Sequence, residues 1–154
     1  MTLSDASIFA PSATNVQTGF RRAELQIKTN SGSDDSTLGV KTLHFSLRKD
    51  DARPLNVSHE YQLTFLEDSS FSTNQFALKT GTIGGQAVGQ DPNQLVLVGN
   101  VNANPVVTLF NTSFTADVWH NFGLTLDFTA KLVIPPQALI NIQIQKQISK
   151  SYDY

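Results

Sequence analysis

Hydrophobic and polar residues alternate with a period of two through most of this chain of 154 residues. In the clearest case, segment 21–28, the apolar positions are Ala23, Leu25 and Ile27, and the positions between them are polar or charged. Successive side chains of a β-strand point to opposite faces, so such a segment can bury one face and keep the other polar. We therefore predict a half-buried strand at 21–28, with the Glu24 carboxylate on its polar face.

The same period recurs further along the chain. It is present at 43–48, 60–65, 75–79 and 120–128. Clusters of turn-forming residues separate these segments, and no useful stretch shows a helical period. Short alternating strands at this spacing are typical of an all-β antiparallel sandwich of the jelly-roll type. Near the end, Ile140, Ile142 and Ile144 also alternate, which indicates either another strand or an exposed, aggregation-prone edge.

Composition excludes several classes of partner. Hydrophobic residues make up 40% of the chain, which suffices for one domain with a sizeable core. The net charge is −2 and no basic run interleaves with aromatics, so we expect no nucleic acid partner. Without an apolar run of about 20 residues we expect no membrane span. The first residues lack the charged and apolar regions of a signal peptide. For the oligomeric state, we expect a monomer.

Metals and cofactors are not expected either. The chain has no cysteine, which excludes disulfides, thiolate ligands and Cys nucleophiles. Its histidines, His44, His59 and His120, do not have the spacing of a zinc site, so structural roles are expected. The sequence therefore predicts neither a metal nor another cofactor.

Two strands present a carboxylate on their polar face. Glu24 shares its face with Arg22, and Glu60 shares its face with Gln62; Lys79 is on the polar side of another strand. Paired carboxylates perform glycoside hydrolysis, in which one protonates the leaving oxygen and the other activates water or attacks the sugar. Glu24 beside an arginine suits the ionised role, which leaves Glu60 as the acid. The alternative is that both are ordinary solvated positions in ion pairs.

Glu67 is a third candidate, because it closes the strand that begins near Glu60. Strict alternation places it with the inward residues Tyr61, Leu63 and Phe65, as a strand end turning into a loop. A β-bulge would reverse this parity.

Two sequons and one tryptophan are weaker signals. Asn56 and Asn111 each begin an Asn-x-Ser pattern, which marks a candidate glycosylation site but is common by chance. Trp119 either stacks on a sugar ring or, more often for a lone aromatic, packs in the core.

Several segments together resemble the catalytic domain of glycoside hydrolase family 131, a family of fungal β-glucanases. The segment 15–25 is similar to the part of that domain with an Arg-x-Glu-Leu motif, here Arg22 to Leu25. Four further segments are similar in the same order, namely 38–47, 59–67, 76–81 and 119–123.

The resemblance implies a β-jelly-roll and a secreted enzyme that acts on β-1,3- and β-1,4-linked glucans. It implies that Glu24 is one catalytic glutamate, and that the second lies within 59–67. Glu60 and Glu67 both remain candidates, with parity favouring Glu60. The side chains that we expect to contact the sugar are those of Arg22, Gln26, Gln62 and Lys79.

The chain also departs from the family. Family members extend further at both ends, and residues 131–154 resemble no part of the family. We therefore expect a partial jelly-roll domain at 1–130 and a divergent tail at 131–154. Missing strands expose sheet edges and apolar faces, which predicts low stability or inactivity. The alternatives are a non-catalytic glucan-binding or structural sandwich, and a fragment that aggregates instead of folding.

Overall fold

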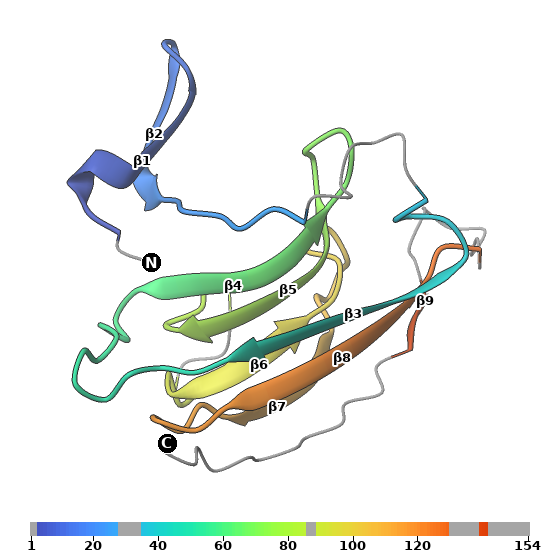
Figure 1. Cartoon of the computed structure of the whole chain (residues 1–154). Coiled ribbons are helices and arrows are strands. Elements are labelled where there is room, and N and C mark those ends of the chain that lie inside the picture. Colours follow the sequence, from blue (N-terminus) through green and yellow to red (C-terminus); the bar gives the residue numbers. More distant parts are fainter. Residues whose placement is uncertain (1–2, 28–34, 86–88, 130–138, 142–154) are drawn as a thin grey trace. The chain divides into compact units, whose positions relative to one another are not determined.

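The computed structural model describes residues 3–27, 35–85 and 89–129, together with the backbone of 139–141 (Figure 1). Contacts divide the chain into two compact units, Met1–Ser36 and Thr37–Tyr154. Each unit is described by itself. No helix in the described part of the chain is long and apolar enough to cross a membrane.

The first unit is a β-hairpin preceded by one turn of 3-10 helix, η1 (Asp5–Ser7). Strands β1 (Ile8–Ser12) and β2 (Asn15–Arg21) pair antiparallel in a two-stranded sheet. The Ser4 hydroxyl caps η1 by accepting from the Ala6 N–H.

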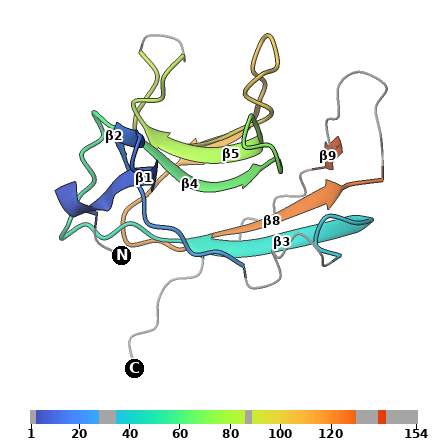
Figure 2. The same cartoon turned by 90° about the horizontal axis from the view of Figure 1, so that it is seen from above.

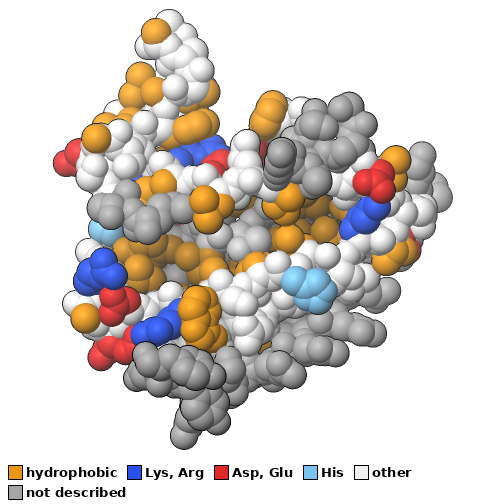
Figure 3. Space-filling view, viewed as in Figure 1, with side chains coloured by type: hydrophobic (Ala, Val, Ile, Leu, Met, Phe, Trp, Pro, Cys, Tyr) orange, Lys and Arg blue, Asp and Glu red, His pale blue; other side chains and the backbone are white. Residues whose placement is uncertain are grey.

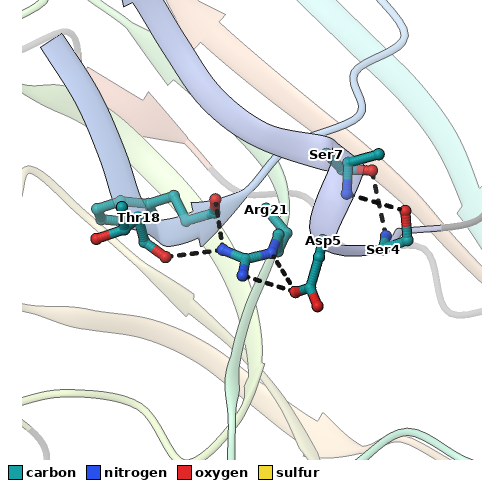
Figure 4. A network of polar contacts seen from close by, with 7 residues as sticks. Ser4, Asp5, Ser7, Thr18 and Arg21 are labelled. Carbon is teal, nitrogen blue, oxygen red and sulfur yellow. Dashed lines mark hydrogen bonds and ion pairs between the residues drawn. The ribbon is translucent and has the colours of Figure 1, made fainter. Parts of the chain in front are cut away.

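An arginine ties η1 to the hairpin. The Arg21 guanidinium donates to Asp5 Oδ1 at 2.8 Å and to the Thr18 carbonyl at 2.7 Å (Figure 4). A lone two-stranded hairpin is marginal in water, so such side-chain bonds matter for its stability.

The half-buried strand predicted at 21–28 is not present. β2 ends at Arg21, residues 22–27 belong to no sheet, and residue 28 lies outside the described residues. The side chains expected in a core, Leu25 and Ile27, are 89% and 57% exposed. Alternation makes a segment able to form a half-buried strand, but a strand also needs a neighbour for its backbone hydrogen bonds. Beyond β2, the Arg22 N–H donates to Ser7 O at 2.9 Å.

The second unit contains two stacked antiparallel sheets (Figures 1 and 2). One has the order β3-β8-β9 and the other the order β4-β5-β6-β7. Their strands are β3 (Val40–Leu47), β4 (Glu60–Glu67), β5 (Asn74–Gly81), β6 (Gln94–Val98), β7 (Thr108–Ser113), β8 (His120–Asp127) and β9 (Leu139–Asn141). The predicted all-β sandwich is confirmed, and the alternating segments at 43–48, 60–65, 75–79 and 120–128 coincide largely with β3, β4, β5 and β8.

The main core lies between the two sheets. It is formed by buried residues of strands β5, β6 and β8 and of the segment after β7: Phe76, Leu78, Leu95, Leu97, Phe114, Phe122, Leu124 and Leu126. Leu43, Phe45 and Leu47 of β3 pack against it, as the alternation predicts. The Phe45 and Phe122 rings stack with centroids 5.0 Å apart. Period-two patterning therefore accounts for the inner faces of both sheets.

A β-bulge divides β4 into two parts of opposite parity. Gln62 pairs with Lys79 and Thr64 pairs with Leu78, so Leu63 is the extra residue. After the bulge Leu66 faces the main core, whereas Phe65 packs against the opposite face of the sheet. Strict alternation is thus wrong for the second half of β4, and Glu67 shares a face with Phe65.

The four-stranded sheet is curved. Figure 2 shows that the ends of β4 and β5 bend away from the sheet of β3 and β8, so the outer face of the four-stranded sheet is concave. Strands β3 and β4 are edge strands, and Figure 3 shows hydrophobic side chains at the surface around them. This agrees with the partial exposure of Phe45, Leu63 and Leu66.

Near the end of the chain, β9 pairs with β8, with Ile140 opposite Leu126. This confirms part of the strand suggested by the alternation at 140–144. The remainder of the predicted tail at 131–154 lies outside the described residues, and the domain limit at residue 130 stays a prediction.

Candidate functional site

Polar and apolar residues form two rows across the concave face of the four-stranded sheet. Residues that pair directly in antiparallel strands share a face, so the register defines each row. One row is Gln62, Lys79, Val96 and Asn111, and the other is Phe65, Ala77, Val98 and Thr108. We call these residues, together with Glu60 and Glu67, the concave face.

Glu60 is held on the concave face by two donors from different elements. The Lys79 ammonium donates to its Oε1 at 2.7 Å, and the Gly84 backbone N–H donates to its Oε2 at 2.8 Å. The side chains of Lys79 and Glu60 are 14% and 33% exposed, so the ion pair is partly screened by protein. Each carboxylate oxygen thus has its own donor, which fixes the orientation of the group and complements its negative charge.

The loop after β5 provides the Gly84 donor because Gly81 starts it with a φ of +83°. A Cβ at Gly81 would lie 1.9 Å from the His59 carbonyl oxygen, so no other residue fits there without a backbone shift. Ile83, in the same loop, packs against Ala77, Val96 and Val98. The loop therefore both covers the apolar middle of the sheet and completes the contacts of Glu60.

The other polar residues of β4 have fewer partners. Gln62 Oε1 accepts from the Asn74 amide at 3.3 Å. Glu67 forms no ion pair or side-chain hydrogen bond with another described residue, although it is half-buried.

Glu24 belongs to the first unit, where it forms its own charged cluster. The Arg22 Nε donates to Glu24 Oε1 at 2.5 Å, and Nη2 contacts the same oxygen. The guanidinium carbon of Arg22 lies 4.0 Å from the centroid of the Phe9 ring, in a cation–π contact. Arg22 thereby connects the carboxylate to the hairpin, even though residues 22–27 form no strand.

The sequence-predicted site residues thus fall into two groups. Lys79 and the β4 residues Glu60, Gln62 and Glu67 lie on one face of the second unit. Glu24, Arg22 and Gln26 lie in the first unit, with Gln26 exposed in the segment that follows β2. Glu60 has a cationic partner as Glu24 does, so the assignment of the ionised role to Glu24 and the acid role to Glu60 stays a prediction.

Sequence reasoning missed two participants on the concave face. Asn111, which the sequence analysis considered only as a sequon, is exposed and pairs with Val96 in the row that also contains Gln62 and Lys79. Its neighbours Thr112 and Ser113 are also polar, so alternation gives no signal there. Gly84 contributes a backbone N–H, for which no side-chain pattern exists. The other sequon residue, Asn56, is in a loop, where its Oδ1 accepts from Ser58.

The aromatic and histidine candidates lie elsewhere. Trp119 is 39% exposed just before β8, so the prediction that it packs in the core is wrong. His120 is buried against Phe114, and its Nε2 is 3.3 Å from the Thr115 carbonyl, which is a structural role. Within 3–27, 35–85 and 89–129, no three acidic or histidine side chains lie close enough to hold a metal ion.

Comparison with known proteins agrees with this architecture. A crystal structure of a GH131 β-glucanase catalytic domain from Podospora anserina is similar, with a TM-score of 0.52 and 24% sequence identity. The similarity covers 75% of this chain and 46% of that one, and at this identity it establishes the fold, an antiparallel β-sandwich. The chain thus spans less than half of the matched structure.

The family follows from a second comparison. The model of the glycoside hydrolase 131 catalytic N-terminal domain matches residues 1–138, which is most of the chain. The chain therefore belongs to glycoside hydrolase family 131, and the predicted resemblance to this family is confirmed. No curated protein matched the chain.

Proposed function

We propose that this protein hydrolyses β-1,3- or β-1,4-linked glucans of cell walls, using the concave face to bind the polysaccharide. The observation that supports this best is the Glu60 carboxylate, which is held on that face by Lys79 and the Gly84 N–H. A catalytic carboxylate needs a fixed position relative to the scissile bond, and two donors on separate elements provide it.

The second carboxylate comes from another segment of the chain. Glu60 and Glu67 are the first and last residues of β4, so their Cα atoms are roughly 20 Å apart along the strand. Glycosidase carboxyl groups are about 5–9.5 Å apart, which disfavours Glu60 and Glu67 as a pair. We therefore propose Glu24 as one member, with Glu60 or Glu67 as the other.

The chemistry requires one carboxyl group to protonate the glycosidic oxygen as the bond to the anomeric carbon breaks. The other carboxylate either attacks that carbon or removes a proton from the attacking water. Glu24 and Glu60 each have a cationic partner, so the proposal assigns these two roles to the pair and not to one residue.

Gln62, Lys79 and Asn111 form the polar row, and we propose that they bind sugar hydroxyls beside the apolar Val96. Arg22 and Gln26 contribute from the segment that contains Glu24. A polymeric wall substrate lies outside the cell, so we propose that the enzyme is secreted and acts as a monomer without a cofactor.

The test is hydrolysis of laminarin and of cellulose oligosaccharides by the purified chain and by Glu24→Gln, Glu60→Gln and Glu67→Gln. The proposal predicts that Glu24→Gln and one of the other two abolish product formation. A matched control is Asp51→Asn, which makes the same carboxylate-to-amide change at an exposed position in the loop between β3 and β4. Turnover that survives all three glutamate changes would refute the acid/base assignment.

The rival is a sandwich that binds glucan without cleaving it, or that serves only as a scaffold. Its support is that Glu60 and Glu67, the two carboxylates of the concave face, lie at opposite ends of β4. Glucan binding without products in the unmodified protein would favour this rival. Neither binding nor products would favour the scaffold.

A further inference from the structure

The turn between β4 and β5 holds a phenylalanine in an unfavourable backbone conformation and exposes its ring. Phe71 has a φ of +56°, a left-handed conformation that is uncommon for a residue with a bulky side chain. Its ring is 80% exposed and belongs to neither hydrophobic cluster of the described residues. Backbone strain and an exposed aromatic ring both cost free energy, and packing of the ring in either hydrophobic cluster does not offset that cost.

This conformation is held by a dense set of hydrogen bonds. The Phe71 N–H donates to the Asp68 carbonyl at 3.0 Å. The Asp68 carboxylate accepts from the Ser70 hydroxyl at 2.9 Å and from both the N–H and the hydroxyl of Ser72 at 3.0 Å. These bonds, the Ser72 N–H above all, lower the pKa of Asp68. The ring is therefore displayed by a rigid turn.

A second loop continues the surface beside this turn. Figures 1 and 2 place the β4–β5 turn and the β6–β7 loop, residues 99–107, at the same end of the sheet. Thr73 Oγ1 donates to Asn100 Oδ1 at 2.8 Å, and the Asn102 amide reaches the Ser72 carbonyl at 3.5 Å. The loop exposes Val101, Val106 and Val107.

The chemistry of this surface disfavours an acidic partner. Residues 69–74 and 99–107 contain no charged residue, their polar groups are hydroxyls and amides, and the charged groups next to them are the carboxylates of Glu67 and Asp68. A nucleic acid or acidic peptide would require cations. A specific protein interface buries about 800 Å² per partner, more than one phenylalanine and three valines supply. A sugar ring offers an apolar face for the aromatic ring and hydroxyls for the amides.

We propose that Phe71 and the adjoining β6–β7 loop form a non-catalytic docking platform for a β-glucan chain at the surface of insoluble polysaccharide. The turn follows Glu67 directly, so it adjoins one end of the concave face. The choice of β-glucan rests on the proposed function, whereas the aromatic character of the platform does not.

The test is adsorption of the full chain to insoluble β-1,3-glucan and to cellulose. Phe71→Gly should weaken adsorption roughly 3- to 10-fold, the range expected for one aromatic contact. Because glycine tolerates the left-handed conformation, this variant should also melt at the same or a higher temperature. Phe71→Trp should retain adsorption. Leu38→Ala, which changes another exposed loop residue of the second unit, should leave adsorption unchanged.

The proposal fails if Phe71→Gly adsorbs as strongly as the unmodified protein, or if Leu38→Ala loses as much. It also fails if removing Phe71 dissociates a dimer observed without glucan, because the ring would then serve self-association. Turnover of short soluble oligosaccharides should be unaffected by Phe71→Gly. An unmodified protein that adsorbs but does not hydrolyse would refute the proposed function and leave the docking platform intact.

Discussion

Replacing Lys79 with methionine tests whether the ion pair with Glu60 positions a catalytic group. The change removes the ammonium that donates to Glu60 Oε1 at 2.7 Å but keeps a side chain of similar length on β5. A charge-assisted hydrogen bond contributes about 1.5–3 kcal/mol when its partner is left unpaired. The Glu60 side chain is 33% exposed, so water replaces part of this loss and the lower figure of about 1.5 kcal/mol applies.

For a chain of this size, 1.5 kcal/mol corresponds to a fall in melting temperature of roughly 3–6 °C. The loss of activity should exceed what this loss of stability alone would cause. Without Lys79, Glu60 keeps only the Gly84 N–H among the contacts described above, and a displacement of about 1 Å can reduce turnover roughly 100-fold.

The assay is kcat and KM on a soluble β-glucan, measured well below the melting temperature. We expect kcat to fall and KM to change little, since Lys79→Met disturbs the reacting group more than the bound chain. Lys49→Met is the matched control: the Lys49 ammonium bonds Asn93 at 3.3 Å and lies over the Phe114 ring, off the concave face. Unchanged kcat for Lys79→Met, or an equal loss in the control, would refute the reasoning.

Three further predictions follow from the same structure. Leu124→Ala empties a fully buried position between the sheets and should cost about 3 kcal/mol in denaturant unfolding; a loss below 1 kcal/mol would mean that the core is loosely packed. Asp68→Asn should destabilise the protein at pH 7 but not at low pH: the lowered pKa of Asp68 gives stability that is complete above about 3.8 and disappears as the pH falls through the folded value. A pH-independent difference in melting temperature would contradict this. A glycan on Asn111 would lie on the concave face, so Ser113→Ala, which destroys the sequon, should raise the activity of protein made in a glycosylating host, whereas Asn56→Gln should not. Equal activity before and after enzymatic removal of glycans would count against the assignment of that face.

Strands β3, β4, β5 and β8 could be predicted because each has a binary pattern, whereas β6 and β7 were not predicted. In β8 the side chains of Phe122, Leu124 and Leu126 recur at every second position, and burying them against a second sheet removes that face from water.

Alternation fails where backbone hydrogen bonding decides the outcome. The pattern around Leu25 is as regular as any in the chain, yet a strand forms only when a neighbour supplies donors and acceptors. In β4 the single extra residue Leu63 reverses the parity that counting assigns to Phe65 and Glu67. No local property of Leu63 marks it as a bulge, because its pairing depends on the register of β5.

The sequence by itself therefore determined the fold class, the inward faces of β3, β5 and β8, and the choice of glutamates as candidates. Only the tertiary structure decided which of them share a surface. Glu60, Lys79 and the Gly84 N–H meet because β5 pairs with β4 and the loop after it turns at Gly81. Side-chain patterning records which face a residue occupies, whereas strand register and loop geometry determine its neighbours.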